Sequence, residues 1–403
     1  MHSFILDART ATPHFPGIGR YVTNLARGLA PLLAPDERLT VLHDPAHPPI
    51  LPSSEALQLV PVLASPFSVQ QQWTIPRLLR GVRGPGAGGK GQEAGGRRHG
   101  PSSVIGRSSV VYHSAYYLMP YRPGVPTVLT VYDLIPLLFP EHSTARARLL
   151  FRWTTALALR AADRVIAISE ATRRDLLTRF RLNPERVAAI PLAADPAFAP
   201  TNIRGQAGVG GQGSGVSRKY GLPERYVLYV GSNKPHKNLG RLVEAWRIAD
   251  CGLRIADCGL VIAGAWDARY PEARERAQML GLGDRVRWLG PVAEADLPAL
   301  YAGATLFVFP SLYEGCGLPA LEALACGAPV ICSNVSSLPE VAGDAALLVD
   351  PLDVDALAAA IGRVLGDEAL AEEMRQRGLR QAARFTWERT AQQTLAVYRA
   401  QAH

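Results

Sequence analysis

The chain contains 403 residues, of which 48% are hydrophobic and 19% are charged, and its formal net charge is +8. This composition is typical of a globular protein with a sizeable core, and the length favours two domains over one. No uncharged apolar run reaches the roughly 18 residues needed to span a bilayer. Asp7 interrupts the first apolar stretch too early for a secretory signal. We therefore expect neither a membrane span nor a signal peptide.

The five cysteines include no Cys-x-x-Cys pair. This spacing predicts neither a zinc site nor a disulfide framework. A reducing cytoplasm is therefore the expected location.

The excess of positive charge is concentrated in two parts of the chain. One group lies in or beside a glycine-rich tract, at Arg77, Arg80, Arg83, Lys90, Arg97, Arg98 and Arg107, and the other runs from Arg146 to Arg186. A basic balance favours anionic partners, although a solvated position is the simpler interpretation for any single arginine. Nucleic acid is not expected, because the basic tracts lack interleaved aromatic residues and known reader motifs. The second group suggests peripheral contact with an anionic membrane, at its inner face, as a weaker hypothesis.

Short apolar segments alternate with amphipathic helical segments, such as residues 147–162, along most of the chain. The segments predicted as strands are residues 4–8, 110–114, 127–133, 164–169, 225–231, 259–265, 285–290 and 304–311. This alternation predicts an α/β fold of parallel sheets with crossover helices. Ligands of such folds bind at the carboxyl ends of the strands, so the residues that follow each strand are the site candidates.

Candidate residues follow three strands in the first half of the chain. Gly17 and Gly19 come after the first strand and precede a helix, but they lack the Gly-x-Gly-x-x-Gly fingerprint and are a weak signal alone. His113 and the pair Tyr132–Asp133 end the next two predicted strands, where a polar side chain would face the cleft. A buried, hydrogen-bonded histidine is the competing interpretation of His113.

Two glycine-rich tracts interrupt the alternation, at residues 81–103 and within residues 202–221. Neither tract can bury a core, so both are expected to be mobile. The predicted organisation is an N-terminal domain at 1–200 with an insertion at 81–107, a linker at 201–221, a second domain at 222–385 and a final helical segment at 386–403.

A perfect tandem repeat, RIADCGL, occupies residues 247–253 and again 254–260. Seven residues make two helical turns, so one copy is expected to extend the helix that precedes it. Two copies are too few for a repeat architecture, and no function is assigned to them.

The second half of the chain opens with GSNKPHKNL, residues 231–239, after a predicted strand. This arrangement suits a phosphate group, because backbone amides and the helix dipole attract the anion and a lysine adds a point charge. Lys237, at the entrance to the next helix, is the best candidate for this role. Solvent exposure is an equally good interpretation of Lys234 and His236.

The segment SLYEGCGLPALEALACGAP, residues 311–329, contains two glutamates eight positions apart. Glu314 is expected in a glycine-flanked loop and Glu322 near the N-terminal end of a helix, whose amides suit anionic or polyhydroxyl ligands. An ionised carboxylate only accepts hydrogen bonds, so it can hold two hydroxyl groups of a ribose or a sugar. The placement favours two separate contacts with one ligand over a hydrolase acid–base pair. A surface acid is the competing interpretation of Glu322.

Together these segments resemble glycosyltransferase family 4, retaining enzymes that use nucleotide sugars and have two facing Rossmann-like domains, the GT-B fold. The matching pieces are GIGRY, TVYDLIPLLFPE, RVIAISEATRRDL, YVGSNKPHKNL, LVIAG and SLYEGCGLPALEALACGAPV, the last followed by LPEVAGDAALLVDP. They occur in family order and cover nearly the whole chain apart from the glycine-rich tracts. The nearest likeness is to bacterial mannosyltransferase-like members that build surface polysaccharide.

The resemblance implies roles by position. Glu314 would bind the transferred sugar, Glu322 the ribose, and Lys237 the diphosphate leaving group, while the turn near Val292 would meet the base. The implied donor-binding positions are Gly17, Gly19, Ser232, Val292, Gly315, Cys316, Gly317, Leu318 and Glu322. Residues 386–403 would form a helix that packs back on the N-terminal domain.

One position departs from the family pattern. Members commonly carry a histidine before the aspartate of TVYDL, and here that position is Tyr132. A phenol can still donate a hydrogen bond to a sugar, but it cannot carry a positive charge. Tyr132 and Asp133 are therefore grouped with Lys237 and Glu314 as catalytic candidates, and His113 is an acceptor-side candidate.

The predicted function is retaining transfer of a mannose- or glucose-type hexose from a nucleotide sugar to a glycan or lipid-linked acceptor. No metal or other cofactor is expected, because Lys237 and helix dipoles would replace a divalent ion and no carboxylate cluster marks a site. The alternatives are a sugar-nucleotide epimerase or phosphorylase on the same fold, and a non-catalytic nucleotide-sugar binder. The donor base, the sugar, the acceptor and the oligomeric state are not indicated.

Overall fold

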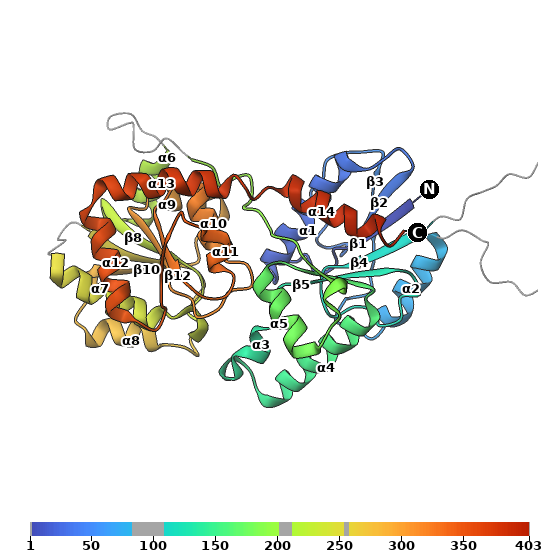
Figure 1. Cartoon of the computed structure of the whole chain (residues 1–403), viewed down its shortest axis with the longest axis horizontal. Coiled ribbons are helices and arrows are strands. Elements are labelled where there is room, and N and C mark those ends of the chain that lie inside the picture. Colours follow the sequence, from blue (N-terminus) through green and yellow to red (C-terminus); the bar gives the residue numbers. More distant parts are fainter. Residues whose placement is uncertain (1, 83–108, 201–211, 254–257, 403) are drawn as a thin grey trace, which may run out of the picture.

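A computed structural model describes residues 2–82, 109–200, 212–253 and 258–402. The chain forms two lobes, each built on a parallel sheet with helices on both faces (Figure 1). The glycine-rich insertion predicted at 81–107 lies, apart from Gly81 and Val82, outside the described residues.

The N-terminal lobe contains a seven-stranded sheet in the order β3-β2-β1-β4-β5-β6-β7, with every neighbouring pair parallel. Its strands are β1 (His2–Asp7), β2 (Glu37–His43), β3 (Leu57–Pro61), β4 (Ser109–Ser114), β5 (Thr127–Val131), β6 (Arg164–Ala167) and β7 (Val187–Ala189). Its helices are α1 (Pro16–Leu29), α2 (Gln71–Val82), α3 (Ile135–Leu138), α4 (Ala145–Ala161) and α5 (Glu170–Phe180).

Successive side chains of β1 point to opposite faces of the sheet and so belong to two separate cores. Phe4 and Leu6 pack on one face with α1, whereas Ile5 packs on the other face with α2 and α4. Because helices cover both faces, β4 and β5 are almost continuously buried, as parallel strands usually are.

The C-terminal lobe contains a six-stranded parallel sheet in the order β10-β9-β8-β11-β12-β13. Its strands are β8 (Arg225–Val230), β9 (Cys258–Ala263), β10 (Val286–Gly290), β11 (Leu306–Phe309), β12 (Val330–Ser333) and β13 (Leu347–Val349). The remaining helices are α6 (Gln212–Tyr220), α7 (Leu239–Leu253), α8 (Glu272–Met279), α9 (Leu297–Gly303), α10 (Leu318–Ala325), α11 (Leu338–Ala342), α12 (Val354–Gly366), α13 (Glu368–Ala382) and α14 (Trp387–Arg399).

The chain returns to the N-terminal lobe at its end, where α13 leads into α14 beside α1 (Figure 1). Thr386 caps α14, and the indole of Trp387 donates a hydrogen bond to the carbonyl of Ala194 at 3.1 Å. Ala391 and Leu395 are buried in the same core as α1. The helix therefore ties the two lobes together.

One part of the predicted organisation is wrong. Residues 212–220, assigned to a glycine-rich linker, form helix α6, which packs on α9 of the C-terminal lobe. Asp296 fixes this helix by accepting hydrogen bonds from Lys219 at 2.6 Å and from Tyr220 at 2.8 Å. These side-chain contacts with Asp296, which lies outside the tract, outweigh the effect of its glycines on the backbone.

The two copies of RIADCGL have different structures. The first copy ends α7 at Leu253, as expected for a helix extension, while Cys258–Leu260 of the second copy begin β9. The residues between them lie outside the described ranges. The surrounding sheet, rather than the local sequence, decides the conformation of the second copy.

Candidate functional site

The carboxyl ends of both sheets face each other, and the two strongest site candidates meet there. The ammonium of Lys237 lies 2.7 Å and 2.9 Å from the two carboxylate oxygens of Glu314. The side chains are only 16% and 8% exposed, so this ion pair is largely shielded from water. The ammonium also lies 5.3 Å from the ring centroid of Phe309. A cation and an acceptor-only carboxylate are thus placed within reach of one ligand.

Local backbone geometry holds Lys237 at this point. It ends a 3-10 turn, Pro235–Lys237, and the following Asn238 adopts a left-handed conformation with φ 61°. The side-chain amide of Asn238 donates to the carbonyls of Pro310 and Pro351, and His236 accepts a hydrogen bond from the amide of Leu312. The lysine loop is therefore fastened directly to the loop that carries Glu314.

The Glu314 loop is held by two serines from the segment after β12. Ser336 accepts a hydrogen bond from the amide of Glu314 at 2.9 Å, and Ser337 donates one to its carbonyl at 3.0 Å. The next residue, Gly315, lies against the N-terminal lobe. A Cβ atom there would lie 2.3 Å from the carbonyl oxygen of Tyr132. Only glycine permits this approach.

This contact predicts that Gly315→Ala blocks closure of the cleft. The added methyl group meets backbone atoms that cannot rotate away, so the lobes must separate. We expect kcat for transfer to fall by about 10²-fold, since small misplacements of reacting groups carry costs of this size. Gly366→Ala, whose Cβ meets nothing within 4 Å, is the matched control and should transfer at the wild-type rate. Equal rates for the two variants would rule out this role of Gly315.

Glu322 is buried on α10 and has a partner at each carboxylate oxygen. Arg20 from the N-terminal lobe donates to one oxygen at 3.0 Å, and the hydroxyl of Tyr301 donates to the other at 3.0 Å. Arg20 also lies 3.3 Å from Glu294. Burial raises the pKa of Glu322 to about 7, although Arg20 and Tyr301 oppose the shift. A ligand diol that binds this carboxylate must displace at least one of these donors.

The raised pKa of Glu322 predicts a pH-dependent donor affinity. Only the ionised carboxylate accepts two hydroxyl groups, and its ionised fraction falls as the pH drops through about 7. We expect KM for the donor to rise about tenfold between pH 8 and pH 6, where about a tenth of the group is ionised. Glu322→Gln should bind more weakly and show a flat profile over this range. A wild-type KM that does not change would contradict the prediction.

Tyr132 and Asp133 approach the Lys237–Glu314 pair from the N-terminal lobe. The Tyr132 ring packs edge-on against Tyr21, and its buried hydroxyl has no hydrogen-bond partner among the described residues. Burial, with the neighbouring Tyr21 and Tyr116, holds the pKa of Tyr132 well above its usual value, so the phenol is a neutral donor. Burial also raises the pKa of Asp133, which accepts a hydrogen bond from the amide of Ile135 and senses the charges of Glu314 and Lys237.

The other predicted donor-binding positions lie at the same two facing edges. Gly17 and Gly19 fall in the first turn of α1, not before the helix as expected, and Arg20 follows them. Ser232 and Val292 follow β8 and β10. Gly317 precedes α10 with φ 74°, which glycine tolerates, and Leu318 begins the helix.

Two side chains do not face the cleft. His113 is 1% exposed, with Nδ1 2.6 Å from the hydroxyl of Tyr398 and Nε2 2.8 Å from that of Thr130. Burial lowers the pKa of His113 to about 3, so it is a neutral core residue that joins β4 to α14. The acceptor-side role predicted for His113 is therefore wrong. The Cys316 side chain is buried in the N-terminal core, which leaves only its backbone for a ligand.

Arg20, Tyr301, Ser336 and Ser337 were missed by the sequence reasoning. Arg20 is part of the GIGRY segment, so its position beside the helix start was an available signal. Nothing in the local sequence marks the other three. Within the described residues, no three histidine, cysteine, aspartate or glutamate side chains come together as a metal site.

Comparisons with known proteins identify the family. The family model "Glycosyl transferase 4-like domain" matches residues 16–193, and "Glycosyl transferases group 1" matches residues 217–381. The O-antigen chain mannosyltransferase B of Escherichia coli is 36% identical over 72% of this chain and 74% of its own length. A D-inositol 3-phosphate glycosyltransferase of Salinispora arenicola is 30% identical over 98% of this chain and 90% of that protein. The match to a serotype-specific mannosyltransferase WbdA of Escherichia coli spans 32% of that longer protein.

Solved structures show the same fold. Sucrose-phosphate synthase from Thermosynechococcus elongatus superposes with a TM-score of 0.67, 24% identity and 99% of each chain covered. HepE from Anabaena, in complex with UDP and glucose, has a TM-score of 0.69, 18% identity, and coverage of 99% of this chain and 100% of that one. The fold class is thus the predicted α/β arrangement of two facing Rossmann-like domains, GT-B. The chain belongs to the group 1 family of glycosyltransferases, with a glycosyltransferase 4-like N-terminal domain.

Proposed function

We propose that the chain is a retaining family 4 glycosyltransferase that moves a mannose- or glucose-type hexose from a nucleotide sugar to a glycan or lipid-linked acceptor. Cell-surface polysaccharide synthesis is the proposed setting. The observation that carries the proposal is the shielded Lys237–Glu314 pair between the two lobes. The names of the relatives, an O-antigen mannosyltransferase among them, favour mannose and a glycan acceptor.

The proposed roles follow from charge and position. Lys237 stabilises the negative charge that develops on the departing diphosphate, and Glu314 accepts hydrogen bonds from the transferred sugar. Glu322 binds the ribose, whose two hydroxyl groups replace Arg20 as its hydrogen-bond donor. The N-terminal end of α1 directs its helix dipole at the phosphates. Tyr132 donates a hydrogen bond to the sugar from the acceptor side.

The proposed reaction keeps the configuration of the anomeric carbon. The acceptor hydroxyl attacks from the face that the phosphate leaves, and the departing phosphate oxygen takes the hydroxyl proton. No protein side chain is then needed as a general base. We propose that no metal or other cofactor takes part, with Lys237 and helix N-termini supplying the positive potential.

A thermal-shift screen tests donor binding first. A donor that binds the folded state raises its apparent stability, so GDP, UDP and ADP sugars should be separable by this measurement. We expect one hexose donor to raise Tm in the wild type and to raise it less in Glu322→Gln at the same donor concentration. Labelled donor then separates the alternatives. Transfer to an acceptor supports the proposal, whereas isomerisation, phosphate dependence or binding without turnover would support an epimerase, a phosphorylase or a binder.

We also propose peripheral contact with an anionic membrane through α4. Leu149, Leu150, Trp153 and Leu157 are between 44% and 64% exposed, and their spacing places them on one face of this helix. Exposed arginines flank them at Arg146, Arg152 and Arg160. An exposed apolar face bordered by arginines is complementary to a bilayer with anionic headgroups.

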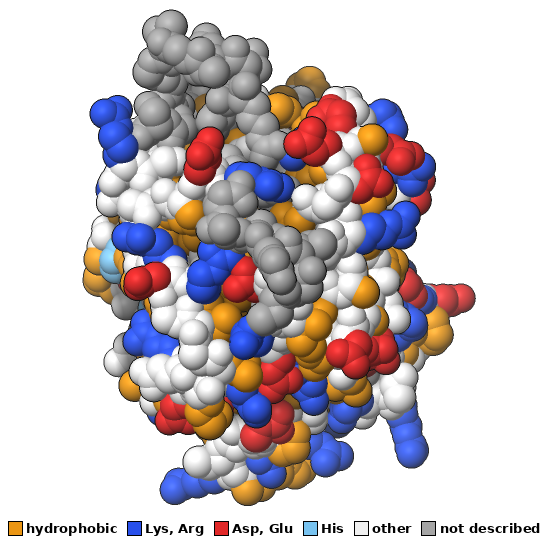
Figure 2. All heavy atoms as spheres, turned by 90° about the vertical axis from the view of Figure 1, so that its left-hand side faces the viewer, with side chains coloured by type: hydrophobic (Ala, Val, Ile, Leu, Met, Phe, Trp, Pro, Cys, Tyr) orange, Lys and Arg blue, Asp and Glu red, His pale blue; other side chains and the backbone are white. Residues whose placement is uncertain are grey.

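The end of the C-terminal lobe has a different surface. Figure 2 shows the end of the C-terminal lobe, where acidic and basic side chains are interspersed. Within the described ranges, no helix is long and apolar enough to cross a membrane. The proposal is therefore limited to surface contact.

Vesicle flotation tests the membrane contact. The wild type should float with phosphatidylglycerol-containing vesicles at low salt and not with phosphatidylcholine alone. Leu150→Ser with Trp153→Ser should weaken binding by about tenfold or more, because two apolar side chains no longer enter the interface. Leu352→Ser removes an apolar group that is 60% exposed on the C-terminal lobe and is the control. No flotation at low salt would reject the proposal.

A further inference from the structure

A cluster of aromatic rings lies at the carboxyl edge of the N-terminal sheet, outside the donor site described above. Phe15 follows β1, Phe67 follows β3 and Tyr116 follows β4. The ring centroids of Phe15 lie 5.8 Å from Phe67 and 5.7 Å from Tyr116, and those of Phe67 and Tyr116 lie 6.4 Å apart. Phe67 is 54% exposed, although a ring of this size is normally buried.

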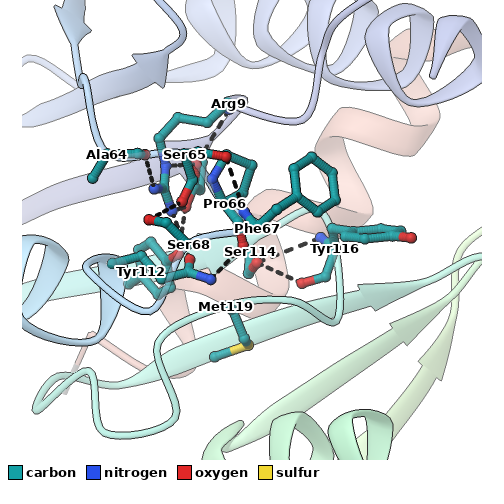
Figure 3. Close-up of polar contacts among 12 residues, drawn as sticks. Arg9, Ala64, Ser65, Pro66, Phe67, Ser68, Tyr112, Ser114, Tyr116 and Met119 are labelled. Carbon is teal, nitrogen blue, oxygen red and sulfur yellow. Dashed lines mark hydrogen bonds and ion pairs between the residues drawn. The ribbon is translucent and has the colours of Figure 1, made fainter. Parts of the chain in front are cut away.

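A buried polar network fixes the loop that carries Phe67. Arg9 donates to the carbonyl of Ala64 at 2.7 Å and to the side chain of Gln71 at 3.2 Å, and Gln71 donates in turn to the carbonyl of Pro66. Figure 3 shows Phe67 and Tyr116 side by side at one end of this network, with Arg9 at the other. The rings are therefore preorganised, which reduces the entropy that a ligand would lose on binding them.

Tyr116 places the cluster next to the reacting centre. It follows β4, which pairs with β5, the strand that leads to Tyr132 and Asp133. Ser114 holds the Tyr116 backbone by donating to its carbonyl at 2.7 Å. Burial, Tyr117 and the charge of Asp133 all raise the pKa of Tyr116, so it is a neutral phenol beside Asp133. A ligand that stacks on these rings therefore lies beside the Lys237–Glu314 pair, on the side of the N-terminal lobe.

The chemistry of the cluster selects a neutral ligand. Arg9 is 1% exposed, and its nitrogens donate to Asp7, Ala64 and Gln71, so this cation is not available to an anion. An aromatic face carries negative potential and attracts the weakly positive C–H groups on one face of a pyranose ring. A nearby phenol can exchange hydrogen bonds with sugar hydroxyls. An acceptor phosphate gains neither interaction.

We infer that Phe15, Phe67 and Tyr116 form the acceptor subsite and that they select a neutral saccharide end by stacking on a sugar ring. The inference rests on the proposed glycosyltransferase function and adds the class of acceptor to it. It separates this chain from its D-inositol 3-phosphate relative, whose name specifies a phosphorylated acceptor. Arg9 is a positioning residue that acts through the loop of Phe67.

Acceptor competition tests this subsite. Transfer is measured to a neutral mannobiose and to inositol 3-phosphate, with wild type, Phe67→Ala, Phe67→Trp and Leu63→Ala. Leu63 is 92% exposed in the same loop and is the control. We expect the wild type to prefer mannobiose. Phe67→Ala should raise KM for mannobiose about tenfold with little change in kcat, since one stacked ring is lost. Phe67→Trp should restore KM, and Leu63→Ala should match the wild type.

Two further measurements separate folding and acceptor binding from turnover. The donor-induced rise in Tm confirms that each variant is folded and has an intact donor site. Saturation-transfer NMR detects mannobiose on the rings without turnover. A mannobiose signal that disappears in Phe67→Ala supports the subsite even when no transfer occurs, a result that would count against the proposed function alone. Wild-type KM in Phe67→Ala, a preference for inositol 3-phosphate, or no mannobiose signal would overturn the inference.

Discussion

Lys237→Met is expected to lower kcat for transfer by about 10²- to 10³-fold, the usual cost of removing one preorganised charge from a water-excluded site. The same variant leaves Glu314 as an unpaired carboxylate that is only 8% exposed. Its free energy of unfolding should therefore fall by about 3 kcal/mol, as it does when one partner of a buried ion pair is removed. Initial rates with labelled donor and urea unfolding measure the two effects.

The double variant Lys237→Met/Glu314→Gln separates catalysis from stability. It removes both charges, so most of the lost stability should return while kcat stays low. A double variant that regains both its stability and the wild-type kcat would show that Lys237 serves only to neutralise Glu314. A single variant with wild-type kcat would remove Lys237 from the reaction.

Arg9→Met should produce a large loss of stability in the N-terminal lobe. Arg9 and Asp7 form an ion pair with side chains only 1% and 6% exposed, and the hydroxyl of Tyr112 donates to Asp7 at 2.6 Å. Without Arg9 the carboxylate is buried and unpaired, which costs about 3–5 kcal/mol. Urea unfolding measures the change, with the exposed Arg174→Met as control. A loss of under about 1 kcal/mol, typical of surface pairs, would contradict it.

The pH dependence of this pair has a definite sign. Burial alone favours neutral Asp7, but the charge and hydrogen bonds of Arg9 and the hydroxyl of Tyr112 hold the pKa of Asp7 below its usual value. A depressed folded-state pKa stabilises the protein above the unfolded-state value of about 3.9, and this contribution is lost as the pH falls below it. The difference between wild type and Arg9→Met should therefore persist through neutral pH and shrink in acid.

Most strands of both lobes were predictable because parallel strands give apolar runs that end in small or polar residues. The strands predicted at 110–114, 127–133 and 225–231 correspond to β4, β5 and β8. Strands β7, β12 and β13, with β2 and β3, were not identified. Length does not set them apart, because β2, with seven residues, is longer than the identified β6 and β11, with four each. A short apolar run cannot be told from a buried helical segment by its periodicity alone. Helix α6 was misassigned because its stabilising contacts come from Asp296, far along the chain.

The candidate site could be proposed from the sequence as a set of positions and not as a set of contacts. Lys237 and Glu314 could each be singled out from a strand end and a glycine-rich loop. Their direct contact spans 77 residues of sequence, and that between Arg20 and Glu322 spans 302. Loop conformation and the docking of the two lobes create these contacts, and neither leaves a local pattern. His113 shows the reverse case, since a strand-end position suggested a cleft residue and α14 buries it.

We propose that the Lys237–Glu314 pair supports retaining transfer of a hexose. The most direct test uses the full chain with the α-linked nucleotide hexose that raises its Tm, a mannose-terminated acceptor, and NMR assignment of the new glycosidic bond. We expect an α-linked product from wild type and at least about 10²-fold less of it from Lys237→Met in the same time. A β-linked product, or equal product from the two proteins, would contradict it.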